Sequence, residues 1–131
     1  MANEYLLDTC TLLWLQLEPS RIPWSLRQIR LPSETRVLVS AATIWEVAIK
    51  WSKGKLFLPS TPDEFLAKAK IESILEILPV SEPEALMVWR LPHLHGDPFD
   101  RIQIAQAIEY GLILATPDPL IRQYAVRTIW E

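Results

Sequence analysis

Short apolar segments alternate with helix-patterned segments along nearly the whole chain, and this alternation limits the possible folds more than any other feature. Apolar runs of four to seven residues predict strands at 4–8, 36–40, 74–80, 112–116 and 126–130. Helix starts and helical spacing predict helices at 12–17, 24–31, 41–54, 61–73, 82–91 and 98–111, with another short helix beginning at Thr116 and Pro117. Apolar strands separated by helices indicate an α/β fold whose parallel sheet is covered on both faces.

Length and composition favour one domain over residues 1–131. The chain has no repeat, no low-complexity segment and no Gly/Ser linker, and half of its 131 residues are apolar. The net charge of −3 excludes a bulk basic nucleic-acid binder of the histone kind. It leaves room for a local rim of cations around an acidic pocket.

Sequence signals for export or membrane insertion are missing. No apolar run approaches the roughly 20 residues that span a bilayer, and the start "MANEYLLD" lacks the basic and apolar regions of a signal peptide. Cys10 is the single cysteine, so an internal disulfide is excluded. We therefore expect a protein of the reducing cytoplasm, without membrane association.

Four acidic residues lie near strand ends or helix starts. Asp8 ends the first predicted strand, Glu46 follows the second, Asp100 begins the helix before the fourth, and Asp118 follows the fourth. In a parallel sheet these positions share one edge, where ligands bind at a switch point of the topology. If the first and fourth strands are neighbours, Asp8 and Asp118 face each other.

Each of these acids also has a purely structural interpretation. Asp8 could cap the helix after it, and Asp118 could favour a helix N-terminus. Glu46 could pair with Lys50 one turn later or form a capping box with Thr43. Taken together, however, several carboxylates at one edge disfavour each other's ionisation unless a cation binds between them. Mg²⁺ prefers such oxygen ligands, and one or two such ions can promote phosphodiester hydrolysis.

The stretch "HGDPFDR" (95–101) combines a helix start with acids. Asp97 has the type and place of an N-cap, Pro98 fits the first helical position, and Asp100 falls at the third. Helix 98–111 would then carry Asp100 toward the sheet edge. Whether Asp97 caps the helix, binds metal, or does both through a water stays open at this point.

Four segments together resemble the PIN-domain ribonucleases, and among them the VapC-type toxins of bacterial type II toxin–antitoxin systems. The segments are "LLDTCTLLWL", "VSAATIWEVAIK", "HGDPFDRIQIAQA" and "LILATPD", which match in order and spacing over nearly the whole chain. The string from His95 through "AQA" is the most specific of them. The resemblance implies a PIN-like three-layer α/β/α sandwich with a parallel sheet of four to five strands.

The resemblance also implies a role for particular residues. Asp8, Glu46, Asp100 and Asp118 match the catalytic, metal-binding acids, and Asp97 is an additional acid that could bind the metal directly or through water. The hydroxyl positions Thr9 and Thr116 match residues that orient ligands or waters. The family further implies Mg²⁺ or Mn²⁺ as cofactor and RNA as substrate, cleaved to a 5′-phosphate and a 3′-hydroxyl. It also implies a homodimer and inhibition by a small cognate antitoxin.

Other residues in these segments have competing interpretations. Arg101 is the nearest cation that could guide RNA, although it could instead pair with a carboxylate at the rim. His93 and His95 lack a second pair of ligands at zinc spacing, so a loop-ordering role is favoured over a metal role. Cys10 fits a small buried residue. Glu46 lies between Trp45 and Trp51 in the sequence, and we expect these two tryptophans in the core or in a dimer contact.

Other enzyme classes fit the sequence less well. A haloacid-dehalogenase-like phosphatase needs a second Asp at position 10, where this chain has Cys10. A response-regulator receiver needs an Asp after the third strand, and a P-loop needs an upstream glycine that "SKGK" lacks. The remaining non-enzyme alternative is an inactive PIN-like scaffold that binds RNA or a protein.

Overall fold

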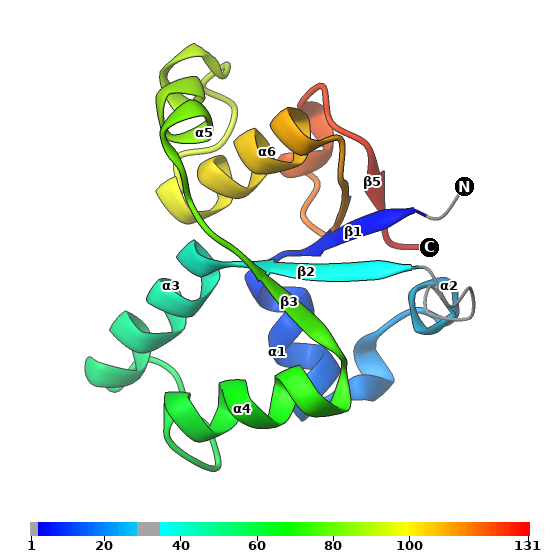
Figure 1. The fold of residues 1–131 in the computed structure, drawn as a ribbon, viewed down its shortest axis with the longest axis vertical. Coiled ribbons are helices and arrows are strands. Elements are labelled where there is room, and N and C mark those ends of the chain that lie inside the picture. Colours follow the sequence, from blue (N-terminus) through cyan, green and yellow to red (C-terminus); the bar gives the residue numbers. More distant parts are fainter. Residues whose placement is uncertain (1–2, 29–34) are drawn as a thin grey trace.

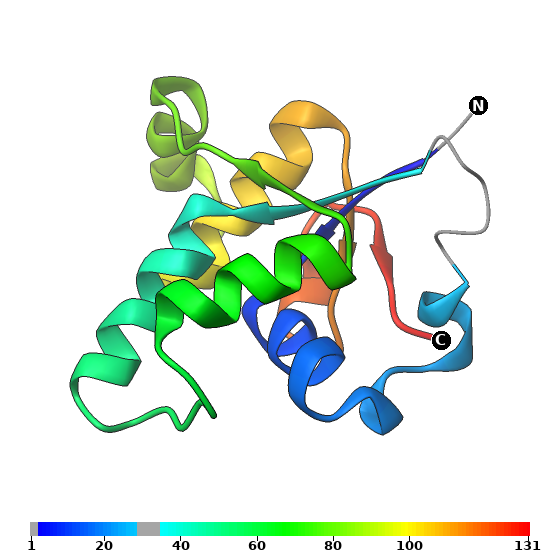
Figure 2. The ribbon, with the colours of Figure 1, turned by 60° about the horizontal axis from the view of Figure 1, so that its bottom comes forward.

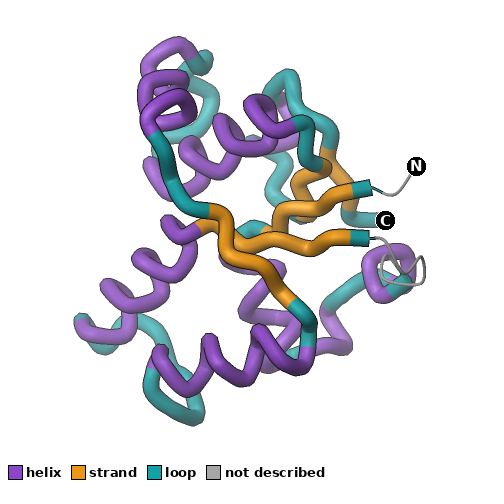
Figure 3. The backbone as a smooth tube through the Cα atoms, in the orientation of Figure 1, coloured by secondary structure: helices purple, strands orange, loops and turns teal. Residues whose placement is uncertain are grey.

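The computed structural model describes residues 3–28 and 35–131, and its centre is a parallel sheet. The strands are β1 (Glu4–Leu7), β2 (Arg36–Ser40), β3 (Leu75–Leu78), β4 (Ile113–Ala115) and β5 (Thr128–Ile129). All neighbouring strands pair in parallel, in the order β3-β2-β1-β4-β5. Figure 3 shows these strands as one central layer between helices. The predicted α/β fold with a parallel sheet is confirmed.

Helices lie on both sides of this sheet (Figures 1 and 2). In Figure 1, helices α1, α3 and α4 lie below the sheet, while α5 and α6 lie above it. Short 3₁₀ turns occur at Pro19–Arg21, Val88–Arg90 and Ile121–Gln123. The helices are α1 (Thr9–Leu17), α2 (Trp24–Arg27), α3 (Ala41–Ser52), α4 (Pro62–Glu72), α5 (Glu82–Met87) and α6 (Pro98–Tyr110).

Two hydrophobic cores lie on opposite faces of the sheet. Successive side chains of a strand point to opposite faces, so Leu6 joins one core and Leu7 the other. Leu6 packs with Ile104 of α6, whereas Leu7 packs with Leu12 of α1. This double burial explains why the strands are apolar throughout, rather than alternately apolar and polar.

The chain reverses its direction of travel across the sheet at β1. It runs from β1 through β2 to β3 on one side, and then crosses to β4 on the other side of β1. Leu7 of β1 pairs with Val39 of β2 and with Ala115 of β4. The predicted neighbourhood of the first and fourth strands is confirmed. The carboxyl ends of β1 and β4 therefore form the switch point.

Several predicted elements are shorter than expected. The helix predicted over 24–31 covers Trp24–Arg27, and residues 29–31 lie outside the described residues. The helix predicted over 82–91 ends at Met87 and continues as a 3₁₀ turn. No helix starts at Thr116 and Pro117. Asp118 there accepts a hydrogen bond from the N–H of Leu120, which closes a local turn instead.

Among the described residues, no helix combines the length and the apolar run that a bilayer crossing requires.

Candidate metal centre

Acidic side chains from four separate segments line one cavity at the switch point. The cavity has a volume of about 370 Å³. Its walls come from the ends of β1 and β4 and from helices α1, α3 and α6. The cavity therefore collects all five acids that the sequence singled out, which are Asp8, Glu46, Asp97, Asp100 and Asp118.

Asp8 is the most deeply placed of these acids, with 3% of its surface exposed. It follows β1 and caps α1, since its Oδ1 accepts from the N–H of Thr11 at 2.8 Å. Its own N–H donates to the carbonyl of Ala115 in β4. Burial raises the pKa of Asp8, although hydrogen bonds from Thr11 and Thr116 oppose that shift. The structural and functional interpretations of Asp8 are therefore compatible.

Glu46 reaches the cavity from helix α3, where it lies on the buried face. That face consists of Ala42, Thr43, Glu46 and Val47. The Thr9 hydroxyl donates to Oε1 of Glu46 at 2.6 Å, and Lys50 Nζ lies 2.5 Å from its Oε2. The pairing with Lys50 that the sequence allowed is present, and the Thr9 bond fixes one oxygen of this carboxylate.

The start of helix α6 brings two more acids to the cavity. Asp97 is the N-cap, because its Oδ1 accepts from the N–H of Phe99 at 2.8 Å and of Asp100 at 3.3 Å. Asp100 lies in the first turn. Burial, together with the neighbouring charge of Asp97, raises the pKa of Asp100 to about 7. A carboxyl group whose pKa is raised by burial and by a neighbouring charge is a candidate for a functional site.

Asp118 approaches from the loop after β4. Its N–H donates to the hydroxyl of Thr116 at 3.1 Å, and Thr116 is fully buried. This bond fixes the backbone at Asp118. The Oδ2 atom of Asp118 points to His95.

His95 is a member of the site that the sequence interpretation underrated. Its Nε2 lies 2.9 Å from Oδ2 of Asp118 and 2.9 Å from Oδ2 of Asp100. Among the described residues, these three side chains form a group whose potential ligand atoms all lie within 4.8 Å of one another. In the sequence, the one indication that His95 belongs to the site is its position two residues before Asp97. Only the fold shows that its ring lies against Asp118.

Comparisons with known proteins identify the family of the chain. The family model described as "PIN domain" matches residues 5–127. The chain belongs to the PIN domain family. A search of the curated proteins finds no significant match.

Solved structures of similar fold cover nearly the whole PIN domain. VapBC2 of Rickettsia felis, bound to a promoter DNA fragment, is 17% identical, with a TM-score of 0.73 over 98% of this chain and 99% of that one. DNA-bound VapBC of Salmonella typhimurium is 20% identical, with a TM-score of 0.69 over 98% of both chains. FitAcB of Neisseria gonorrhoeae is 22% identical, with a TM-score of 0.59 over 95% and 96%. The fold closely resembles that of the VapC and FitB toxins.

Arg101 of this PIN domain does not face the acidic cavity as a guide for RNA. Its side chain is 7% exposed, and its guanidinium donates to backbone carbonyls, including those of Val88 and Pro92 at 2.9 Å each. Among the described residues, the hydrogen bonds of Arg101 go to backbone carbonyls and to Tyr124 and not to a carboxylate, so its contacts do not support a role in guiding RNA. A guanidinium has five N–H donors, and here those of Nη1 and Nη2 donate to loop carbonyls and to the Tyr124 hydroxyl.

Two other predictions are corrected by burial. Trp45 is 64% exposed, so it does not belong to the core, and its ring meets Phe99 edge-on at 5.5 Å between centroids. Its role in a dimer contact stays a prediction. Cys10 is only half-buried and lines the acidic cavity. Burial and the nearby charge of Asp8 raise the pKa of the thiol to about 11, which makes it a poor nucleophile at neutral pH.

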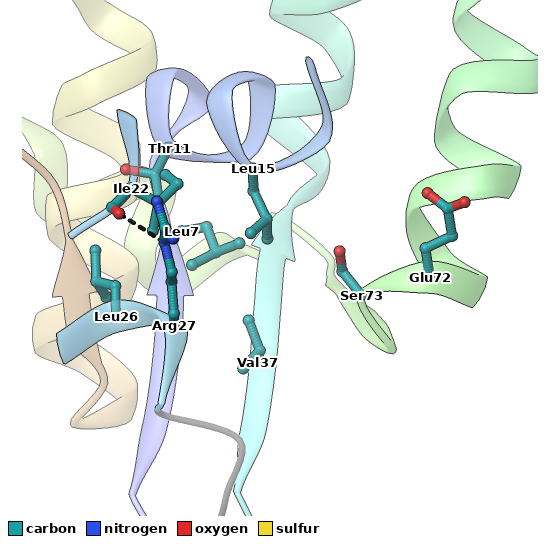
Figure 4. A pocket seen from close by; sticks show the side chains of 9 residues that line it. All are labelled: Leu7, Thr11, Leu15, Ile22, Leu26, Arg27, Val37, Glu72 and Ser73. Carbon is teal, nitrogen blue, oxygen red and sulfur yellow. Dashed lines mark hydrogen bonds between the residues drawn. The ribbon is translucent and has the colours of Figure 1, made fainter. Parts of the chain in front are cut away.

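A second cavity of about 190 Å³ lies apart from the acids, under helix α1 (Figure 4). Leu7, Leu15 and Leu26 give it an apolar lining, and Arg27 at its edge donates to the carbonyl of Ile22 at 2.9 Å. It contains none of the acids at the switch point.

Proposed function

We propose that this PIN domain is a metal-dependent endoribonuclease and the toxin of a type II toxin–antitoxin pair. The observation that carries the proposal is the convergence of five carboxylates on one open cavity at the switch point of the sheet. PIN domains are typically nucleases that bind divalent metal, and the fold resembles the VapC toxins. The proposed unit is a single domain over residues 1–131.

The donor set fits Mg²⁺ or Mn²⁺. All five cavity acids supply oxygen, which is the ligand type that hard divalent cations prefer. Burial is the main cause of the raised pKa values of Asp8 and Asp100, and neighbouring carboxylates add to it. A cation bound among these acids favours their charged forms. We propose that Asp8, Glu46, Asp100 and Asp118 hold the ion, with Asp97 beside them.

Several side chains prepare the site for an RNA phosphodiester. Thr9 fixes the orientation of Glu46, and Thr116 fixes the backbone of Asp118. Lys50 lines the cavity and partly offsets its negative charge, which an RNA backbone would otherwise meet as repulsion. When bound, the cation supplies an activated water and stabilises charge on the leaving oxygen.

Removing Asp8 is the sharpest test of this proposal. Asp8→Asn keeps the size of the side chain but removes its charge from the cavity. We expect cleavage of a mixture of structured RNAs in Mg²⁺ or Mn²⁺ to fall by more than about 100-fold, because even outer partners of a metal ligand are worth roughly 10–100-fold. Gel analysis of the products, with EDTA in parallel, measures the effect.

Glu109→Gln is the matched control, because Glu109 is an exposed acid near the end of α6, outside the cavity. It should leave cleavage unchanged. Cleavage that persists in EDTA or in Asp8→Asn contradicts the metal mechanism. A complete absence of metal-dependent cleavage in the unsubstituted protein supports the inactive scaffold instead.

The proposed partners are a second copy of the chain and a small cognate antitoxin. Solved relatives of this fold include VapBC complexes, which supports the antitoxin. Exposed aromatic residues on α3 and in the 3₁₀ turn after α5 support a homodimer, and they include Trp45 and Trp89. Light scattering of the purified chain measures its mass against the 15.1 kDa of one copy. Co-purification with the product of a small adjacent upstream reading frame tests the antitoxin.

A further inference from the structure

A buried arginine, Arg101, forms hydrogen bonds to the backbone of the loop before helix α6. Arg101 Nη2 donates to the carbonyls of Val88 at 2.9 Å and Leu91 at 3.3 Å. Its Nη1 donates to the carbonyls of Pro92 at 2.9 Å and His95 at 3.3 Å. Bonds from a charged donor are stronger than those between neutral groups. One side chain therefore fixes the backbone from the end of the 3₁₀ turn to His95.

A buried tyrosine hydroxyl holds the same loop from a second element. Tyr124 lies after the 3₁₀ turn Ile121–Gln123, and its hydroxyl accepts from the N–H groups of His95 at 2.9 Å and Leu94 at 3.1 Å. It donates to the carbonyl of Pro92 at 2.8 Å and also contacts Arg101 Nη1 at 3.1 Å. The N–H and C=O of His95 are thus both bonded to buried side chains.

The ring of His95 is also fixed. Its Nδ1 accepts from the N–H of Asp97 at 3.1 Å, so this nitrogen carries a lone pair and no proton. In the neutral ring the proton therefore belongs to Nε2. That N–H group donates to Oδ2 of Asp118 at 2.9 Å, and Oδ2 of Asp100 lies 2.9 Å from the same nitrogen. In this tautomer neither ring nitrogen of His95 has a free lone pair to offer a metal.

We propose that His95 positions Asp100 and Asp118 as a hydrogen-bond donor, and that Arg101 and Tyr124 act through it by fixing its loop. Asp100 belongs to α6, while Asp118 belongs to the loop after β4, and the imidazole joins them. Without this donor, two like-charged carboxylates move apart. Residues that hydrogen-bond to metal ligands orient them and tune metal affinity. The inference rests on the proposed function for its metal, and on the contacts above for its geometry.

Tyr124→Phe is the first test, because it removes one hydroxyl and keeps the buried ring. We expect the dissociation constant for Mn²⁺, measured by EPR of the free ion in the absence of RNA, to rise by roughly 10-fold or more. Tyr110→Phe is the matched control, since it removes a hydroxyl that bonds Glu84 and Ser81, away from the cavity. It should leave the Mn²⁺ affinity unchanged. Equal effects of the two variants overturn the proposal.

Two substitutions of His95 separate hydrogen-bond donation from metal ligation. His95→Ala should weaken Mn²⁺ binding by roughly 10–100-fold, and His95→Gln, whose amide can donate a similar hydrogen bond, should recover part of that loss. Pulsed EPR of the Mn²⁺-loaded protein should show no directly coordinated nitrogen. A nitrogen coupling that disappears in His95→Gln overturns the proposal and makes His95 a ligand. Arg101→Lys is a less informative variant, because losing the buried guanidinium and its hydrogen bonds also destabilises the fold.

NMR of the metal-free protein makes failure of this inference distinguishable from failure of the proposed function. The ¹⁵N shifts of the His95 ring should show the Nε2–H tautomer in the unsubstituted protein and in Tyr110→Phe. In Tyr124→Phe we expect a mixture of tautomers. A protonated Nδ1 in the unsubstituted protein contradicts the inference whatever the metal does. If the tautomer is as proposed but no Mn²⁺ binds, the proposed function fails and the placement of His95 stands.

Discussion

Asp8 shows how one residue combines a folding role and a site role. Its Oδ1 accepts the N–H of Thr11, which caps α1, while its carboxylate lines the acidic cavity. Asp97 does the same at α6, and Glu46 pairs with Lys50 while it faces the cavity. Most of the helix caps and ion pairs that the sequence offered as structural roles for these acids are present. The same side chains also line the cavity. An acid that caps a helix at a sheet edge is already aimed at the switch point.

At the same scale, Asp100 makes the stability of the metal-free protein depend on pH. Its pKa is about 7 in the folded state, mainly because of burial, against an ordinary value near 3.8. Between these values the folded state binds more protons than the unfolded state, so stability falls as pH rises through this window. We expect the protein in EDTA to unfold in less urea at pH 8 than at pH 5.

Asp100→Asn supplies the control for this pH dependence, because the amide has the same shape and does not titrate. In this variant the loss of stability between pH 5 and pH 8 should be smaller than in the unsubstituted protein. An identical loss in both proteins contradicts the assigned role of Asp100. Urea titrations followed by tryptophan fluorescence measure both curves.

At the scale of elements, helix α6 is the part of the fold that serves the site most. Asp97 and Pro98 begin it, Asp100 and Arg101 occupy its first turn, and Gly111 ends it in the left-handed conformation, at φ +66°. Its interior positions 103–107 are all buried, so the middle of the helix is enclosed by the residues packed around it. A helix held this firmly fixes the direction of the acids in its first turn.

The two roles of Asp97 can be separated by substitution. Asp97→Asn keeps a side-chain oxygen that caps α6, whereas Asp97→Ala loses the cap and should cost about 1 kcal/mol of unfolding free energy. Both substitutions remove the charge, so both should weaken Mn²⁺ binding to a similar extent if Asp97 contributes to the metal site. Urea unfolding in EDTA and Mn²⁺ titration measure the two effects independently. Unchanged Mn²⁺ affinity in both variants would leave Asp97 a cap alone.

At the scale of the whole molecule, the metal and the fold should stabilise each other. The acids come from segments distant in sequence, and only the folded sheet brings them to one cavity. A ligand that binds only the folded state stabilises it by RT ln(1 + [L]/Kd), about 2.7 kcal/mol at 100 times Kd.

We therefore expect saturating Mn²⁺ to raise the midpoint of thermal unfolding by roughly 10 °C at pH 8. EDTA should reverse the rise, and Asp8→Asn should abolish most of it. Binding requires deprotonated carboxylates, so the rise should be smaller at pH 6, below the pKa of Asp100. Calorimetry of both proteins gives the midpoints. An equal rise in Asp8→Asn would place the ion elsewhere on the molecule.

The sequence by itself determined the five strands, several of the helix starts and the identity of the five acids. These features depend on local patterns: apolar runs mark strands buried on both faces, and the N-cap at Asp97 needs only its own neighbours. From the sequence, the pairing of β1 with β4 could only be assumed. Strand order depends on contacts between segments about a hundred residues apart, which local patterns do not contain. The confirmed order then places Asp8 and Asp118 at one cavity.

Only the tertiary structure decided what Arg101, His95 and Trp45 do. A charged residue beside an acidic motif resembles a surface cation in the sequence, yet Arg101 is buried because the loop before α6 folds over it and offers it carbonyls. His95 turns toward Asp118, 23 residues away, because Tyr124 and Arg101 hold its backbone. Trp45 stays exposed because the buried face of α3 is taken by Thr43, Glu46 and Val47. Burial and side-chain direction arise from packing between elements, which no local pattern records.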